Sequence, residues 1–401
     1  MTVNIGQAKQ TQTPAARSTS VFDRLIGGEF QQLPVFLSLV LIWIVFEILN
    51  NSFLTSRNLS NLVLQMAEYG LLGVGETLIL LLGEIDLSIA AVSAIGGAIL
   101  AVLAGNGVNP YVAIIAGALS GTVLGLFQGF WVTVLRVPSF IVTLAGSLAF
   151  LGLLFVLIGQ EGTVPIMNNT INAIAGNYLP DWLSWVLVAV ALLLMVWAAV
   201  RDRAKRQKLG LPPKSAASTW TKLILSAAVM IGATVLLNAY QGVPIAGLVL
   251  IVFVVLLAWI CQSTAFGRHI YAVGGNAEAA RRAGINVKGV RIMVFTLAGT
   301  MAAIGGIVGA SRLGAASTAS GGSDLLMDSI AAAVIGGTSL FGGYGSVWNA
   351  LLGALVIGSI ENGMALLNAP TSTKYLVEGA ILLLAVTFDT FTRMRRKQLG
   401  R

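Results

Sequence analysis

The sequence predicts an all-α bundle of membrane-spanning helices, and three observations support that prediction. Of the 401 residues, 56% are apolar and only 10% are charged, whereas a soluble domain averages roughly 45–50% apolar and about 25% charged residues. A chain this poor in charge cannot cover a surface that faces water. The apolar residues also gather into long segments, and the basic residues fall almost entirely between alternate segments.

Twelve segments have the length and composition of spans, because a helix needs about 20 mostly apolar residues to cross a bilayer. They cover residues 34–50, 62–83, 88–104, 111–135, 139–159, 182–200, 220–238, 246–262, 291–311, 326–340, 347–367 and 374–390. The second and third run together almost without a break, and the tenth is short. The sequence therefore predicts 10–12 spans, some of them short or broken, within a transmembrane domain over residues 34–391.

The Lys and Arg residues indicate that both termini are cytoplasmic, because these residues concentrate in cytoplasmic loops. With the N-terminus inside and twelve alternating spans, all but three of the 24 Lys and Arg residues lie on that side. We expect a polar cytoplasmic tail over 1–33, which lacks the features of a signal peptide, and a basic cytoplasmic tail over 392–401. The extra basic loop 201–222 is expected to be solvated, with contact to anionic lipid or a partner as the alternative.

Small residues recur at helical spacing in two segments. The fourth carries Gly117, Gly121, Gly125 and Gly129, and the ninth carries Ala302, Gly306 and Ala310. Helices in lipid associate by close packing, for which small residues are needed. These stripes predict contacts between helices and say nothing about what is transported.

No motif for enzyme chemistry is present in the sequence. It contains no phosphate-binding loop with its lysine, no zinc-protease motif and no nucleophile elbow. The glycine-rich stretch 336–345 is expected to be a tight turn between packed helices. With one cysteine, Cys261, and one histidine, His269, we expect no catalytic residues, no metal site and no cofactor. The net charge of +8 fits a membrane orientation signal, so we expect no nucleic-acid partner.

Acidic residues inside the apolar segments need a reason, because a carboxylate at the centre of a spanning helix costs roughly 2.5–3.5 kcal/mol. The densest group is Glu84-Ile85-Asp86-Leu87-Ser88, which interrupts an apolar stretch from about 69 to 104. Asp86 or Ser88 could simply cap the following helix. Alternatively, the helix is broken and its polar ends line a pathway.

A similar motif recurs later in the chain. Residues 86–92 resemble residues 328–334, and Thr143-Leu-Ala-Gly146 recurs as Thr296-Leu-Ala-Gly299; we interpret both motifs as recurring helix starts. The candidates for a substrate pathway are Glu84, Asp86, Ser88, Thr143, Asp328 and Asn362.

A short charged helix is predicted between two spans, on the cytoplasmic side. Asn276 is a favourable N-cap, Gly284 a favourable terminator, and Glu278 and Arg282 have the i,i+4 spacing of an ion pair. The alternatives are a solvated turn or a docking helix that enters a groove on a soluble partner.

At this segment the chain resembles a known family. Residues 271–286 are similar to the coupling segment of permeases from bacterial ATP-binding-cassette (ABC) monosaccharide importers, the ribose, xylose and galactose group. Residues 85–88, 137–146, 328–332 and 336–347 resemble the same group, so the similarity covers about 57–389. Glu84, residues 206–211 and residues 238–244 resemble the xylose branch, whereas Ser329 and Trp348-Asn349 depart from the common pattern.

The resemblance implies a permease of the bacterial inner membrane that carries a monosaccharide, D-xylose in the first instance. It implies a homodimer or paired permease, a separate cytoplasmic ABC ATPase and a periplasmic sugar-binding protein. The coupling helix 276–285 would enter the ATPase groove with Asn276, Glu278, Ala279, Ala280, Arg281, Arg282 and Gly284. The alternatives are an ion-coupled secondary transporter, which suits buried carboxylates, or an ABC permease for ribose, galactose or a polyol.

Overall fold

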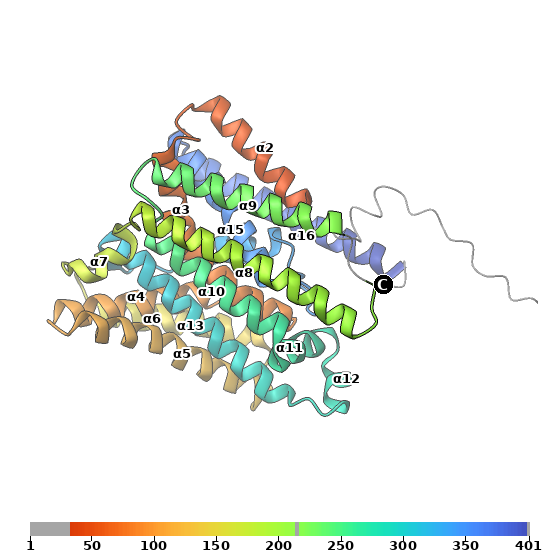
Figure 1. Ribbon diagram of the computed structural model, residues 1–401. Helices are drawn as coiled ribbons and strands as arrows, with labels where there is room; N and C mark the ends of the chain where they lie inside the picture. The colour runs from red at the N-terminus through yellow and green to blue at the C-terminus, as the bar shows by residue number, and fades with distance from the viewer. Residues whose placement is uncertain (1–32, 213–215, 399–401) are drawn as a thin grey trace, which may run out of the picture.

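The computed structural model describes residues 33–212 and 216–398, which form a bundle of helices running roughly side by side (Figure 1). The helices are α2 (Leu33–Leu49), α3 (Ser56–Leu81), α4 (Ile89–Gly105), α5 (Pro110–Thr133), α6 (Ser139–Ile158), α7 (Asn169–Gly176), α8 (Asp181–Lys208), α9 (Ala216–Asn238), α10 (Ile245–Ser263), α11 (Ala265–Gly275), α12 (Ala277–Arg282), α13 (Val287–Leu313), α14 (Ser323–Ile335), α15 (Val347–Leu366) and α16 (Thr371–Gln398). Strands β1 (Thr163–Pro165) and β2 (Ala315–Ser317) pair antiparallel. The predicted helical class is confirmed, with this small ladder added.

Each of the twelve predicted segments coincides with or overlaps a helix. Within the described residues, eight helices are long and apolar enough to cross a membrane, and α2 and α4 are apolar but shorter. The prediction for 326–340 is wrong in extent, because α14 ends at Ile335 and its 13 residues rise only about 20 Å. Residues 336–346 then form the turn that precedes α15, as expected for the glycine-rich stretch.

Helices α3 and α13 form the centre of the bundle. In the apolar 18-residue stretch of each helix, 78% of the residues of α3 and 67% of those of α13 are buried, against 22% for α5. The predicted packing role of the small residues is confirmed where α5 crosses α13. A Cβ at Gly121 would collide with the carbonyl oxygen of Gly299, and a Cβ at Gly125 would collide with that of Phe295. The two backbones touch there, as close helix packing in lipid requires.

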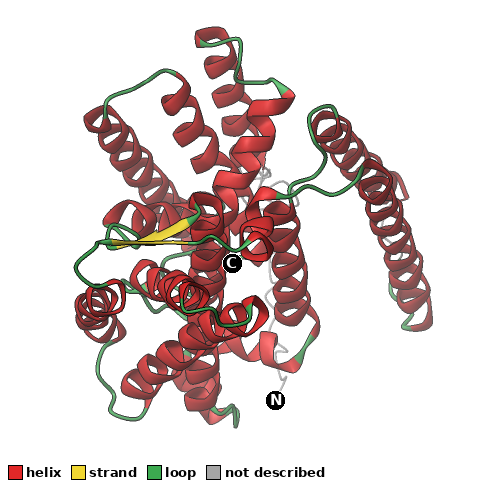
Figure 2. Ribbon diagram, turned by 90° about the vertical axis from the view of Figure 1, so that its left-hand side faces the viewer, coloured by secondary structure: helices red, strands yellow, loops and turns green. Residues whose placement is uncertain are grey.

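Helices α8 and α9 form a hairpin outside the main bundle. Only 6% of the residues in the apolar stretch of each are buried, and in Figure 2 the pair stands at the right-hand edge, reached by two loops. The expected loop over 201–222 is largely helical instead, since α8 continues to Lys208 and α9 begins at Ala216. Lipid-facing helices need little protein contact, because every backbone hydrogen bond is made within the helix.

The chain ends differ in part from the expected tails. Residues 1–32 of the predicted N-terminal tail lie outside the described residues, and α2 begins at Leu33. At the other end α16 continues to Gln398 through most of the predicted tail 392–401. In Figure 1 the end of α16, the end of α8 and the whole of α12 lie at the right-hand end of the bundle.

Candidate functional site

The polar segment between α3 and α4 is a true interruption of helix at the level of the bundle core. Asp86 is 2% exposed and Ser88 is fully buried. The Asp86 Oδ1 atom accepts hydrogen bonds from the Ser88 amide at 2.8 Å and the Ser88 hydroxyl at 2.7 Å. Gln128 of α5 donates to the Ser88 hydroxyl at 2.6 Å. We call Asp86, Ser88, Gln128 and Thr143 the break cluster.

The capping interpretation of this segment is wrong in detail. Ser88 stands at the N-cap of α4, but its side chain makes no cap hydrogen bond, because its hydroxyl donates to Asp86. Asp86 in turn accepts the amide of Ser88, one position before α4 begins. Asp328 also departs from a helix start, since it is the sixth residue of α14. The recurring motif therefore marks two buried acids in different positions relative to their helices.

Helix α6 closes the other side of the break. The Thr143 hydroxyl donates to the carbonyl oxygen of Ile85 at 3.3 Å, and the Ser139 hydroxyl accepts the Ile85 amide at 3.5 Å. These contacts satisfy backbone groups that no longer have a helical partner, which is necessary where water is scarce. Glu76 of α3, also fully buried, interacts electrostatically with Asp86.

Glu84 and Asn362 do not join the break cluster. Glu84 forms an ion pair with Arg291 of α13, with 3.0 Å between Oε1 and the guanidinium nitrogen. The Asn362 Oδ1 atom accepts from Asn58 Nδ2 at 2.6 Å, and its own Nδ2 donates to Gln65 at 3.3 Å. Both residues connect elements of the bundle: Glu84 connects the segment between α3 and α4 to α13, and Asn362 connects α15 to α3.

Asp328 lies in a second polar region, a groove formed by α14 and α16 with α15 behind it. The groove has a volume of about 300 Å³ and is lined by Asp324, Asp328, Tyr375 and Glu378 among apolar side chains. The Tyr375 hydroxyl donates to Asp324 Oδ2 at 2.9 Å. We call this region the acidic groove. Its size is at the lower end of small-molecule sites, roughly 300–1,000 Å³.

Charges beside the groove are partly compensated. Lys374 lies 3.4 Å from Glu361 Oε2, and deeper in the bundle Arg312 lies 3.9 Å from Glu68 Oε2. The side chains of both pairs are between 18% and 31% exposed. The carboxylates that line the acidic groove can accept hydrogen bonds from hydroxyl groups of a bound molecule.

The predicted short helix exists as α12, and its caps and ion pair are confirmed. Asn276 Oδ1 accepts the amide of Ala279 at 2.9 Å, and Gly284 ends the turn with φ +84°. Glu278 lies 3.2 Å from both Arg281 and Arg282. Ala280 is buried and fixes the helix to the bundle, whereas the charged side chains are more than half exposed.

A backbone joint connects α11, the helix directly before α12, and the turn 336–346 to the end of α3 at the break. The Gly343 amide donates to the carbonyl oxygen of Leu81, the last residue of α3, at 2.9 Å. A Cβ at Gly274 of α11 would collide with the same Leu81 oxygen. Tyr271 donates to the Gly345 carbonyl at 3.0 Å, and partial burial raises the pKa of this hydroxyl to about 12, so it is protonated at neutral pH.

Sequence reasoning missed several residues of these sites. Gln128 is an amide inside an apolar segment and next to the glycine stripe, a signal that could have identified it. Tyr375 and Asp324 carry no local signal, since only the packing of α16 on α14 brings them together. Among residues 33–212 and 216–398, no group of His, Cys, Asp and Glu side chains is placed to hold a metal ion.

A bundle of apolar helices with buried polar clusters and one charged helix at its end is the architecture of a membrane transport protein. A family model described as a branched-chain amino acid transport system / permease component matches residues 58–386. The chain belongs to this permease family. It is a multi-pass protein of the bacterial inner membrane, and the family comprises transporters rather than enzymes.

Individual proteins similar to this chain include permeases for sugars. The xylose transport system permease protein of Haemophilus influenzae is 39% identical over 368 residues, covering 90% of this chain and 98% of the relative. The xylose transport system permease protein of Escherichia coli K12 is 42% identical over 347 residues, covering 86% and 88%. The ribose import permease of Bacillus subtilis is 34% identical, covering 90% and 94%. No solved structure matches the chain.

Proposed function

We propose that the chain is the membrane-spanning permease subunit of an ABC importer that carries D-xylose. The observation that carries this proposal is the identity of 39–42% to xylose permeases along nearly the whole of both chains. The ribose import permease is less similar, at 34%. The family resemblance at 271–286, inferred from the sequence, supports the same conclusion.

Energy for transport comes, in this proposal, from a separate cytoplasmic ATPase that receives α12 in a groove. Two copies of the chain, or a pair of permeases, form the channel, and a periplasmic sugar-binding protein delivers the sugar. The exposed charges of Glu278, Arg281 and Arg282 supply polar contacts for such a groove. The basic ends of α8 and α16 at the same end of the bundle (Figure 1) support a cytoplasmic position for α12 and both termini.

The sugar route that we propose passes the acidic groove at Asp328, with the break cluster as the moving wall. Hydroxyl groups of a neutral pentose donate hydrogen bonds that Asp324, Asp328 and Glu378 can accept. Leu325 and Leu326 of α14 pack against the apolar cluster that contains Ile89 and Val92 of α4, so in this proposal the groove and the break shift together. Glu84 and Asn362 act in this proposal as connections between elements of the bundle.

Movement of α12 reaches the break through the joint at Leu81 and through the ion pair of Glu84 with Arg291. Helix α13 starts five residues after α12 ends, so a push on α12 displaces Arg291 as well. ATP binding in the partner would thus change the geometry around Asp86 without any nucleotide site in this chain.

The test is uptake of radiolabelled D-xylose in a bacterial host that lacks its own xylose permease. The host carries this chain together with an ATPase and a sugar-binding protein of a xylose import system. We expect uptake with the unaltered chain, and loss of both uptake and ATPase co-purification when Glu278→Ala and Arg281→Ala are combined. Glu161→Gln, an exposed carboxylate near β1, is the control and should leave both unchanged. Normal uptake and retained ATPase association in the double variant would contradict the docking role.

A further inference from the structure

The α8–α9 hairpin is held to the bundle at one end. The Leu179 amide donates to the Val243 carbonyl at 2.9 Å, and the Ile245 amide donates to the Asn177 carbonyl at 3.1 Å. Tyr178 and Tyr240 meet edge to face there, with 6.2 Å between ring centroids. Along the rest of the hairpin most side chains are exposed, as expected for helices that face lipid.

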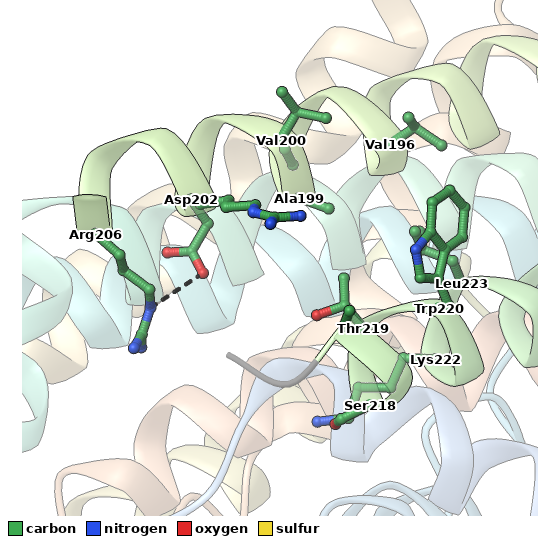
Figure 3. Close-up of a pocket in the computed structure, with 13 residues that line it drawn as sticks. Val196, Ala199, Val200, Asp202, Arg206, Ser218, Thr219, Trp220, Lys222 and Leu223 are labelled. Carbon is green, nitrogen blue, oxygen red and sulfur yellow. Dashed lines mark ion pairs between the residues drawn. The ribbon is translucent and has the colours of Figure 1, made fainter. Parts of the chain in front are cut away.

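The opposite end of the hairpin contains a cavity between the two helices, with a volume of about 360 Å³. Its apolar part is formed by Val196, Val200 and Leu223 with the ring of Trp220. Its polar part is formed by three basic residues, one acid and two hydroxyl residues: Arg203, Arg206, Lys222, Asp202, Ser218 and Thr219. Figure 3 shows Asp202 and Arg206 towards one end, Val196, Trp220 and Leu223 towards the other, and Lys222 near Ser218. The cavity is therefore amphipathic along its length.

Charge at this end of the hairpin is strongly positive. Over residues 196–212 and 216–223 the chain carries Arg201, Arg203, Lys205, Arg206, Lys208 and Lys222, against the single acid Asp202. Asp202 pairs with Arg206 at 3.4 Å. The Arg201 guanidinium lies 5.1 Å from the ring centre of Trp197, a contact typical of side chains at the surface of a bilayer.

The length of α8 puts the cavity at headgroup depth. The apolar part from Trp182 to Val200 has 19 residues, which rise about 28 Å, close to the roughly 30 Å hydrocarbon core of a bilayer. Arg201 and the basic residues after it then lie among the headgroups, while Val196 and Val200 still face acyl chains. The anionic leaflet surface attracts basic residues at this position.

We propose that the cavity between α8 and α9 binds one anionic phospholipid. The phosphate lies among Arg203, Arg206 and Lys222, where guanidinium groups can donate two hydrogen bonds to a phosphate. One acyl chain follows Val196, Val200 and Leu223 out of the cavity. The ligand is a lipid and not free phosphate, because the apolar part opens directly onto the lipid-facing sides of both helices: Val200 is 63% exposed and Trp220 59%. The bound lipid fills the space that protein contacts leave open.

The test is a titration of the delipidated full-length protein, followed by native mass spectrometry and thermal unfolding. The three probes are phosphatidylglycerol, phosphatidylcholine with the same acyl chains, and glycerol 3-phosphate. We expect one phosphatidylglycerol to bind and to raise the unfolding temperature, with phosphatidylcholine at least about tenfold weaker and glycerol 3-phosphate without effect.

Two double variants distinguish lipid binding in the cavity from general electrostatic attraction of anionic lipid to this end of the hairpin. Arg203→Gln with Lys222→Gln removes two charges that line it, whereas Arg201→Gln with Lys205→Gln removes two charges from the same end outside it. We expect the first to weaken phosphatidylglycerol binding about tenfold and the second less than about threefold, with lipid-free unfolding temperatures unchanged. Equal losses in both variants, equal binding of phosphatidylcholine, or saturable binding of glycerol 3-phosphate would each overturn the proposal.

Discussion

The break cluster and the acidic groove both contain buried acids, but they use their carboxylates differently. Asp86 accepts two hydrogen bonds from Ser88, which in turn accepts one from Gln128. In the groove, Asp324, Asp328 and Glu378 line open volume, and Asp324 accepts hydrogen bonds from Tyr375 at 2.9 Å and from Ser323 at 3.2 Å. The carboxylate of the first region is used within a helix junction, which moves as a unit in the proposed mechanism, whereas those of the second line open volume.

The largest expected effect is at the joint below the break. Gly274→Ala places a methyl group against the Leu81 carbonyl, whereas Gly275→Ala meets nothing within 4 Å. Overpacking of this kind costs about 1–3 kcal/mol or more. We expect Gly274→Ala to lower the unfolding temperature in detergent and to abolish xylose uptake, and Gly275→Ala to do neither. Equal behaviour of the two neighbouring variants would disprove the close contact.

Removing the acceptor at the centre of the break cluster should have the next largest effect. Asp86→Ala leaves the amide and the hydroxyl of Ser88 without their acceptor, which costs about 1–3 kcal/mol per buried group. Asp86→Asn keeps an oxygen in place and serves as the matched control. Thermal unfolding of both variants measures the difference. If Asp86→Ala is as stable as the unaltered chain, the cluster does not hold the junction.

A substitution in the acidic groove should reduce transport and leave stability nearly unchanged. Asp328→Asn keeps the shape of the side chain and removes a charge that lines the open volume. We expect stability within about 0.5 kcal/mol of the unaltered chain and xylose uptake reduced about tenfold, equivalent to about 1.4 kcal/mol. Uptake assays paired with unfolding curves give both numbers. A large loss of stability with unchanged transport would assign Asp328 to packing instead.

The smallest effect is expected at the rim of the groove. Tyr375→Phe deletes the exposed hydrogen bond to Asp324, and such a bond contributes roughly 0.5–1.5 kcal/mol or less when water can replace it. We expect uptake within about twofold of the unaltered chain. A loss as large as that of Asp328→Asn would make Tyr375 a direct sugar contact.

The spans and the short helix α12 could be predicted from the sequence because their causes are local. Lipid demands continuous apolar helices, and Asn276 and Gly284 cap α12 through contacts within three residues. The extent of α14 could not, since apolar residues continue beyond its end at Ile335 and only the glycine turn ends it. Composition cannot distinguish apolar residues that continue a helix from apolar residues in the turn that follows it.

The grouping of the site residues needed the tertiary structure. Asp86 and Thr143 were expected to share a pathway, and the structure does bring them to one break through Ile85. Asn362 has the same polar character in sequence, yet it pairs with Asn58, 304 positions away. Nothing in either neighbourhood indicates that partner, because the contact depends on how α15 crosses α3.

The source of energy for transport distinguishes an ABC permease from a secondary transporter, and reconstitution in vesicles measures it directly. The purified chain is placed in vesicles alone with an imposed proton or sodium gradient, or together with its ATPase and sugar-binding protein and ATP. We predict that D-xylose accumulates against its gradient only in the complete system and stops when Glu278→Ala and Arg281→Ala are introduced. Accumulation by the chain alone, driven by an ion gradient, would contradict the account and identify a secondary transporter.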